Sequence, residues 1–210
     1  MRTRLTATCV VLTLTAMLTG CMGSAKFPTY YTLQVPSAPL PSDAREPQAS
    51  VAVCEFRSPA YLRQGAIVYR ASPEVVGFYH YHRWAVDPRE ALTQAIEDRL
   101  RASGRFALVK SYDGRSDVDY ILSGSLEKLE EVDYERGVKV EVALSAQMTD
   151  LRSGKTVWAN RASEVTEVDK RSFPSVVAEM SLASDRAVQK LLASLNVSAG
   201  AKPGAQSDLR

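Results

Sequence analysis

The chain has 210 residues, of which 45% are hydrophobic, 24% charged and 8% aromatic. This length and composition fit one ordinary globular domain and exclude collagen-like, disulfide-scaffold and wholly disordered chains. Residues 1–20 hold two of the 26 basic side chains and none of the 24 acidic ones, so the rest of the chain has a formal net charge of zero. Because nucleic-acid binding needs a basic surface, we expect no nucleic-acid partner.

Residues 1–20 have the features of a bacterial export signal peptide. Two arginines precede an apolar stretch, Leu5 to Leu18, which is diluted by several threonines. A helix that spans a bilayer needs about 20 apolar residues, so this stretch is too short to be a permanent anchor. We expect it to be removed from the mature protein.

The signal peptide ends in Leu18-Thr19-Gly20-Cys21, the pattern of a bacterial lipobox. In a lipobox, the cysteine thiol takes up diacylglycerol and becomes the first residue after cleavage. The alternative is a chance cysteine near a cleavage site that lies elsewhere. We predict lipidation of Cys21, which anchors the protein to a membrane through acyl chains without spanning it. Residue 22 is Met rather than Asp, which favours the periplasmic face of the outer membrane.

The other cysteines carry little information about redox chemistry. Cys9 leaves with the signal peptide and Cys21 is acylated, so Cys54 has no partner for an intramolecular disulfide. Cys54 lies in a β-rich run with no adjacent His or Lys. We therefore expect a buried structural thiol rather than a reactive one.

The chain divides into four parts. After the signal peptide at 1–20, residues 21–50 form a lipid anchor and proline-rich spacer, within which Thr29–Val35 could be a short strand. Residues 51–197 are expected to form a single domain, and 198–210 a flexible tail.

Two helices are predicted within the domain. The first starts with Asp87 as N-cap, has proline at its first position and Glu90 three residues after the cap, and ends at Gly104. The second starts near Phe173 and carries an apolar stripe at helical spacing. The stripe consists of Val177, Met180, Ala183, Ala187, Leu191 and Leu195.

Strands account for most of the rest. Residues 138–148 alternate between apolar and polar, which is typical of a half-buried antiparallel strand. The runs at 118–126 and 156–165 flank it and predict a meander, and further candidate strands are 51–56, 66–70 and 75–84. We expect an α+β fold with a mixed, largely antiparallel sheet and two helices packed on one face.

The sequence contains no catalytic motif, and we expect neither an enzyme nor a cofactor. Ser153-Gly154-Lys155-Thr156 resembles the end of a phosphate-binding loop, but position 149 is Thr instead of Gly, so a hairpin turn is favoured. His80 and His82 would point to one face of a strand and could share a zinc ion. No third ligand is evident, and a polar-aromatic strand face is the favoured interpretation, with no metal.

Aromatic residues are concentrated between Tyr61 and Trp84. On a regular strand, Tyr79, Tyr81 and Arg83 would share one face, and the other face would carry Phe78, His80, His82 and Trp84. One face could simply be core. Because both cannot be equally buried under one helix layer, the other is a candidate contact surface for a partner or for lipid. The candidate contact residues are Tyr69, Arg70, Tyr79, Tyr81, Arg83 and Trp84.

The order of these features resembles a known family. The lipobox is followed by Tyr30-Tyr31-Thr32-Leu33, by the run at 51–56, by Ile67-Val68-Tyr69-Arg70 and by an aromatic strand that ends in Trp84 ahead of a helix. This order is similar to that of the ABC-type transport auxiliary lipoproteins (PqiC/YmbA-like) over roughly residues 21–195. The individual motifs are short, and their order and spacing carry the resemblance.

The resemblance implies a non-enzymatic role beside an MCE-domain (mammalian cell entry) protein, an ABC permease and its ATPase. Such a system moves lipids or other hydrophobic molecules between the inner and outer membranes. The ATP site would belong to the partner. Since MCE proteins form rings, the resemblance also implies a ring-like homo-oligomer for this chain.

The competing interpretation is an outer-membrane lipoprotein that regulates cell-wall synthesis, and a periplasmic hydrolase is a third. A cell-wall regulator needs a tether tens of residues long that can cross the peptidoglycan. If the strand at 29–35 docks on the domain, the tether is only residues 22–28, which reach about 25 Å. If it does not dock, the tether lengthens to roughly 100 Å and the distinction is lost.

Overall fold

The computed structural model describes residues 26–36, 49–115, 117–134, 137–169 and 172–195. The predicted signal peptide, Cys21 and the predicted tail at 198–210 lie outside these residues. In chain order the elements are β1 (Thr29–Tyr31), β2 (Ser50–Val53), the 3-10 helix η1 (Ala60–Gln64), β3 (Ala66–Arg70), β4 (Val76–Trp84), α2 (Pro88–Ala102), β5 (Leu108–Ser111), β6 (Tyr120–Val132), β7 (Lys139–Asp150), β8 (Thr156–Glu167) and α3 (Phe173–Ala193).

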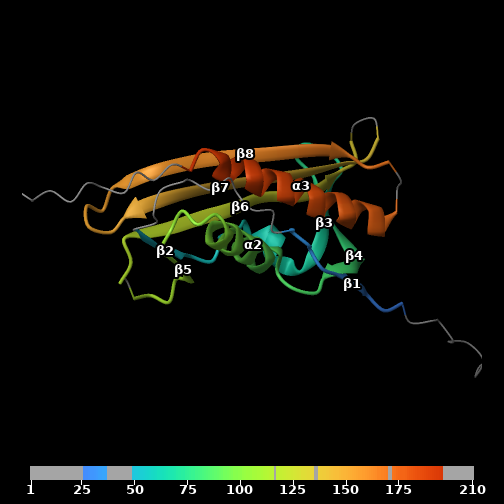
Figure 1. Ribbon diagram of the computed structural model, residues 1–210. Helices are drawn as coiled ribbons and strands as arrows, with labels where there is room; N and C mark the ends of the chain where they lie inside the picture. Colours follow the sequence, from blue (N-terminus) through green and yellow to red (C-terminus); the bar gives the residue numbers. More distant parts are fainter. Residues whose placement is uncertain (1–25, 37–48, 116, 135–136, 170–171, 196–210) are drawn as a thin grey trace, which may run out of the picture.

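All eight strands belong to one sheet, and β6 is its central strand (Figure 1). One edge of β6 pairs antiparallel with β7 along its whole length. Its other edge pairs in parallel with β2 near its start and with β3 near its end. The long strands pair antiparallel and the short ones mostly parallel, which confirms the predicted α+β fold with a mixed sheet.

Both helices cover the same face of the sheet, as predicted. Helix α3 packs on β7 and β8, whereas α2 lies beside α3 and contacts β5 (Figure 1). Every residue of the predicted stripe from Val177 to Leu195 is buried, although Leu195 lies just beyond the end of α3. None of the helices in the described ranges is long and apolar enough to cross a membrane.

The ends of α2 follow the predicted signals. The Asp87 carboxylate accepts a hydrogen bond from the Arg89 backbone N–H at 2.9 Å, and Pro88 occupies the first helical position. The helix ends at Ala102, and Gly104 follows with a φ of 64°, a conformation that glycine adopts without strain.

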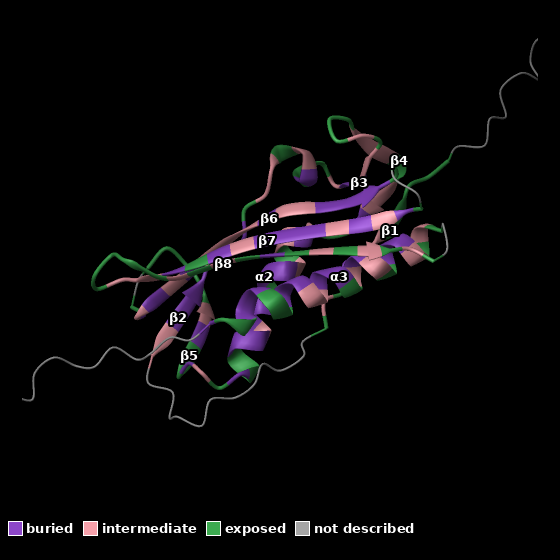
Figure 2. Cartoon of the chain, turned by 90° about the horizontal axis from the view of Figure 1, so that it is seen from above, coloured by how far each residue is buried: buried purple, intermediate pink, exposed green. Residues whose placement is uncertain are grey.

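The predicted meander is confirmed as β6, β7 and β8. The link from β7 to β8 is a turn in which the Asp150 N–H donates to the Lys155 carbonyl at 2.9 Å, so the Ser153–Thr156 run is part of a hairpin. Among the described strands β8 pairs with β7 alone, and from Val157 onward exposed residues alternate with partly or fully buried ones (Figure 2). Strand β5 and η1 were not predicted, because four or five residues are too few to show a period.

Gly124 of β6 lies directly against the buried Phe56 ring. A Cβ atom here would lie 2.3 Å from Cζ of the buried Phe56 ring and 2.7 Å from the Ser145 carbonyl oxygen of β7. The second contact is with backbone, so it cannot be relieved by a rotamer change. Glycine is therefore required in β6 for the sheet to pack against Phe56.

We expect Gly124→Ala to lower the free energy of unfolding by about 1–3 kcal/mol, because the core would be overpacked. Urea unfolding followed by circular dichroism measures this change. Ser123→Ala, the neighbouring substitution on the other face of β6, is the control and should stay within about 0.5 kcal/mol of wild type. Equal stability of the two variants would contradict the tight contact.

Candidate functional site at the β1–β4 edge

The predicted strand at 29–35 docks on the domain, although only three of its residues are in strand conformation. Strand β1 pairs in parallel with β4, so that Thr29 lies opposite His82, Tyr30 opposite Arg83 and Tyr31 opposite Trp84. Leu33, beyond the strand, is buried in the core. The N-terminal segment is thus built into the sheet edge that carries the aromatic strand.

The same segment is also fixed to both helices. The Gln34 N–H donates to Oγ of Ser181 in α3 at 3.2 Å. Nη2 of Arg99 in α2 donates to the Pro36 carbonyl at 2.6 Å and forms an ion pair with Asp185 of α3. Because Arg99 is almost fully buried, its bonds to Pro36 and Asp185 are largely shielded from water and help to hold the segment that follows β1 in place.

A β-bulge in β4 overturns the predicted alternation of the aromatic strand. Ala66 of β3 lies opposite Arg83, but Val68 lies opposite Phe78, so β3 advances two residues while β4 advances five. The extra residues break the two-residue period. As a result Tyr79 and His82, which were expected on opposite faces, contact the same ring on α3.

This ring belongs to Phe173, the first residue of α3, and five residues together form the inner aromatic cluster: Tyr31, Tyr69, Tyr79, His82 and Phe173. The His82 ring stacks on Phe173 with 3.3 Å between centroids, and Tyr79 meets Phe173 edge-on at 4.5 Å. Tyr69 lies 4.7 Å from Tyr79, and the Tyr31 hydroxyl is 3.1 Å from Nδ1 of His82. The cluster joins β1, β3, β4 and α3, so its first role is packing.

Two consecutive carboxylates of the central strand β6 lie beside β3, the strand that pairs with β4. Glu130 and Glu131 of β6 are only 0% and 2% exposed. Arg70 grips Glu130 with two hydrogen bonds, from Nε at 2.6 Å and Nη2 at 3.0 Å, and this bonding raises the pKa of Arg70. The Tyr79 hydroxyl donates to Glu131 at 3.2 Å. Burial of this pair was not predicted, since consecutive acids normally mark an exposed segment.

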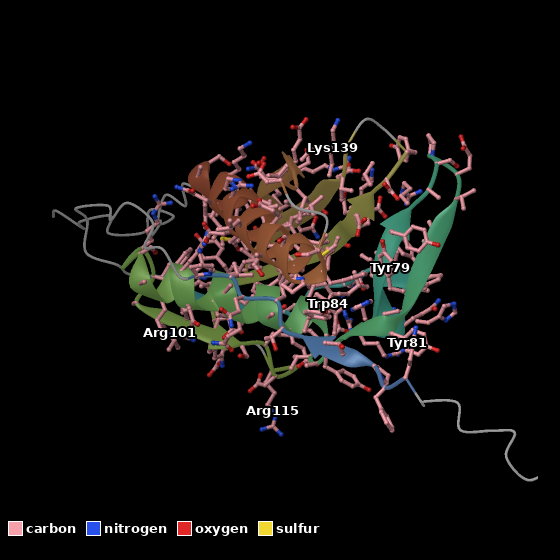
Figure 3. The ribbon with its side chains drawn as sticks, turned by 90° about the vertical axis from the view of Figure 1, so that its right-hand side faces the viewer. Tyr79, Tyr81, Trp84, Arg101, Arg115 and Lys139 are labelled. Carbon is pink, nitrogen blue, oxygen red and sulfur yellow. The ribbon has the colours of Figure 1, made fainter. Side chains whose placement is uncertain are left out.

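The structure divides the six candidate contact residues into two groups. Tyr69 and Tyr79 pack in the inner aromatic cluster. Arg70 and Tyr79 bind the two buried carboxylates, and Trp84 lies in the core. Only Tyr81 and Arg83 face outward: Tyr81 is 48% exposed, and Arg83 donates to the Gln64 carbonyl at 2.8 Å. In Figure 3, Tyr79 points into the molecule and Tyr81 lies at its margin near β1.

Comparison with known proteins identifies the family. The sequence matches the ABC-type transport auxiliary lipoprotein component family over residues 31–192. The chain belongs to this family. A protein from Xanthomonas campestris, 17% identical, superposes with a TM-score of 0.66 over 79% of this chain and 93% of its own. An uncharacterized protein, 13% identical, does so with a TM-score of 0.61 over 79% and 96%. Both share the fold. No curated protein matches the sequence.

The remaining reactive side chains of this auxiliary lipoprotein offer little chemistry. Burial raises the pKa of the half-buried Cys54 thiol, which keeps it protonated. His80 is exposed, whereas His82 is held in the inner aromatic cluster. Among the residues that the structure describes, no three metal-ligating side chains gather at one place.

The stacked His82 should make the stability of the auxiliary lipoprotein pH-dependent. Burial lowers the pKa of His82 below its ordinary value near 6.5, so the unfolded chain binds more protons as the pH falls through that value. The His82 contribution to stability is therefore present above pH 6.5 and lost below it. We expect His82→Phe to lose less stability than wild type between pH 7 and pH 5, as measured by thermal unfolding. His80→Phe, at the exposed position, should keep the wild-type dependence, and identical profiles for all three proteins would contradict the assignment.

Proposed function

We propose that this protein is a non-enzymatic, lipid-anchored periplasmic component of an MCE/ABC-type transport system. Its acylated Cys21 would hold it on the outer membrane, where it docks the assembly that carries lipids or other hydrophobic molecules between the membranes. Its partners would be an MCE-domain protein, an ABC permease and the ATPase. Membership of the auxiliary lipoprotein family, with a match that spans nearly the whole described domain, is the observation that carries this proposal.

The docking of β1 supports the transport role over the cell-wall alternative. With Thr29 paired to His82, only residues 22–28 separate the acylated cysteine from the folded domain. Seven residues reach at most about 25 Å. A domain on so short a tether stays at the membrane surface, where it can receive cargo, and does not reach enzymes on the far side of the cell wall.

The same assembly suggests a ring-like homo-oligomer. An MCE ring presents several equivalent sites, which several copies of this chain could occupy by following the symmetry of the ring. Strand β8, which within the described part of the chain pairs with β7 alone, offers hydrogen-bonding groups for contact between copies. Light scattering of the purified lipoprotein in detergent tests this part of the proposal, and a monomer at all concentrations would refute it.

Affinity purification from crosslinked cell envelopes tests the functional class. We expect the tagged, lipidated protein to recover an MCE-domain protein together with its permease, as identified by mass spectrometry. An unrelated tagged outer-membrane lipoprotein serves as the control for non-specific recovery. Recovery of peptidoglycan synthases without any MCE protein would instead establish the cell-wall alternative.

A further inference from the structure

Three aromatic side chains lie exposed where the chain enters the domain. Phe27 is 83% exposed, Tyr30 is 60% exposed and Tyr81 is 48% exposed. They come from two elements, since Phe27 and Tyr30 belong to the chain around β1 and Tyr81 to β4. In a water-soluble protein, large apolar side chains gathered in this way mark a contact surface more often than isolated ones do.

The charges around these rings are basic. Nζ of Lys26 lies 5.9 Å from the centroid of the Tyr81 ring, in a cation–π geometry, and Tyr30 lies opposite Arg83 in the β1–β4 pairing. Residues 26–36 and 76–86 contain no Asp or Glu. We refer to Lys26, Phe27, Tyr30, Tyr81 and Arg83 as the outer aromatic-basic surface.

The position of the lipid anchor determines what this surface can meet. Cys21 is five residues before Lys26, so the surface lies at most about 18 Å from the acylated residue. The headgroup region is about 5–7 Å deep on each side of the hydrocarbon core. Tyrosine and lysine suit this region, because their apolar parts enter the boundary while their polar ends stay in water.

We propose that the outer aromatic-basic surface lies in the headgroup region of the membrane to which Cys21 is attached. Phe27 and the two tyrosines contact the acyl boundary, and Lys26 and Arg83 face the lipid phosphates. The domain is then fixed in one orientation on the bilayer, with β1 and the adjoining part of β4 against the lipid. This inference rests on the acylation of Cys21 in the proposed function.

Quenching of tryptophan fluorescence by lipids brominated on their acyl chains tests the contact. The full lipidated protein is reconstituted into phospholipid vesicles. The emission of the parent protein is subtracted from that of each variant, so that only the introduced tryptophan, the reporter, is measured. The reporters are Tyr30→Trp and Phe27→Trp, and the second keeps the test valid if the first disturbs β1. The control is Val157→Trp at the start of β8, where the side chain is 48% exposed and the strand begins at the opposite end of the sheet from β1 (Figure 1).

We expect the added emission at positions 27 and 30 to shift to shorter wavelength and to be largely lost with brominated lipids, while that at position 157 is unchanged. Flotation of the same vesicles distinguishes a failure of the oriented membrane contact from a failure of the proposed lipid anchor. Protein that floats but shows no quenching at positions 27 and 30, or equal quenching at position 157, would overturn the oriented contact alone. Protein that fails to float would overturn the lipid anchor, and this inference with it.

Discussion

Replacing Cys21 with alanine is expected to move the protein from the membrane fraction to the soluble fraction, provided that it is exported behind a signal peptide of the ordinary, non-lipoprotein type. Each CH2 group of an acyl chain buried in the bilayer contributes about 0.8 kcal/mol, so two or more chains hold a protein stably. No described helix can take their place, and the exposed aromatic side chains near the N-terminus are too few for stable binding. Fractionation of envelopes by ultracentrifugation and immunoblotting measures the shift.

Two controls make the result specific. Cys54→Ala, expressed with the native lipobox, removes the only other cysteine of the mature chain and should stay entirely with the membrane. The thermal midpoint of the soluble Cys21→Ala protein should match that of wild type, because the anchor acts through covalently attached acyl chains and the substitution leaves residues 26–195 unchanged. A Cys21→Ala protein that sediments with membranes would contradict the lipobox interpretation.

Elements whose hydrophobic pattern repeats many times were predictable from the sequence. Helix α3 and strand β7 each repeat their pattern many times, so every repeat adds to the same conclusion. The ends of α2 were equally clear, because Asp87, Pro88 and Gly104 each meet a local steric or hydrogen-bonding need. Each of these features depends only on residues close together in the chain.

The face that each aromatic side chain takes was not predictable. The bulge in β4 arises where the register between β3 and β4 shifts, and no residue in 78–84 signals that shift in the sequence. Phe173, which organises the inner aromatic cluster, is far from β4 in sequence and was assigned only to a helix start. Tyr30 and Phe27 were likewise not singled out, because the sequence does not show which side chains stay exposed once β1 joins the sheet edge.

Burial of Glu130 against Arg70 should make truncation of the Arg70 side chain strongly destabilising. The Glu130 side chain is 0% exposed, and Arg70 is its charged partner among the described contacts. Removing one member of a buried ion pair leaves the other without compensation, so Arg70→Ala should lower the free energy of unfolding by about 3–5 kcal/mol. Urea unfolding at neutral pH measures this loss.

A matched pair of variants distinguishes the buried charge from the loss of side-chain contacts. Lys128→Ala removes the partner of Glu141, a pair between strands β6 and β7 that is partly open to solvent, and should lose at most about 1 kcal/mol. The double variant Arg70→Met with Glu130→Leu removes both buried charges and should regain most of the stability lost in Arg70→Ala, because well-packed apolar residues often replace a buried ion pair without loss. If the double variant were as unstable as Arg70→Ala, packing of the Arg70 side chain, and not its charge, would be what stabilises the contact between β3 and β6.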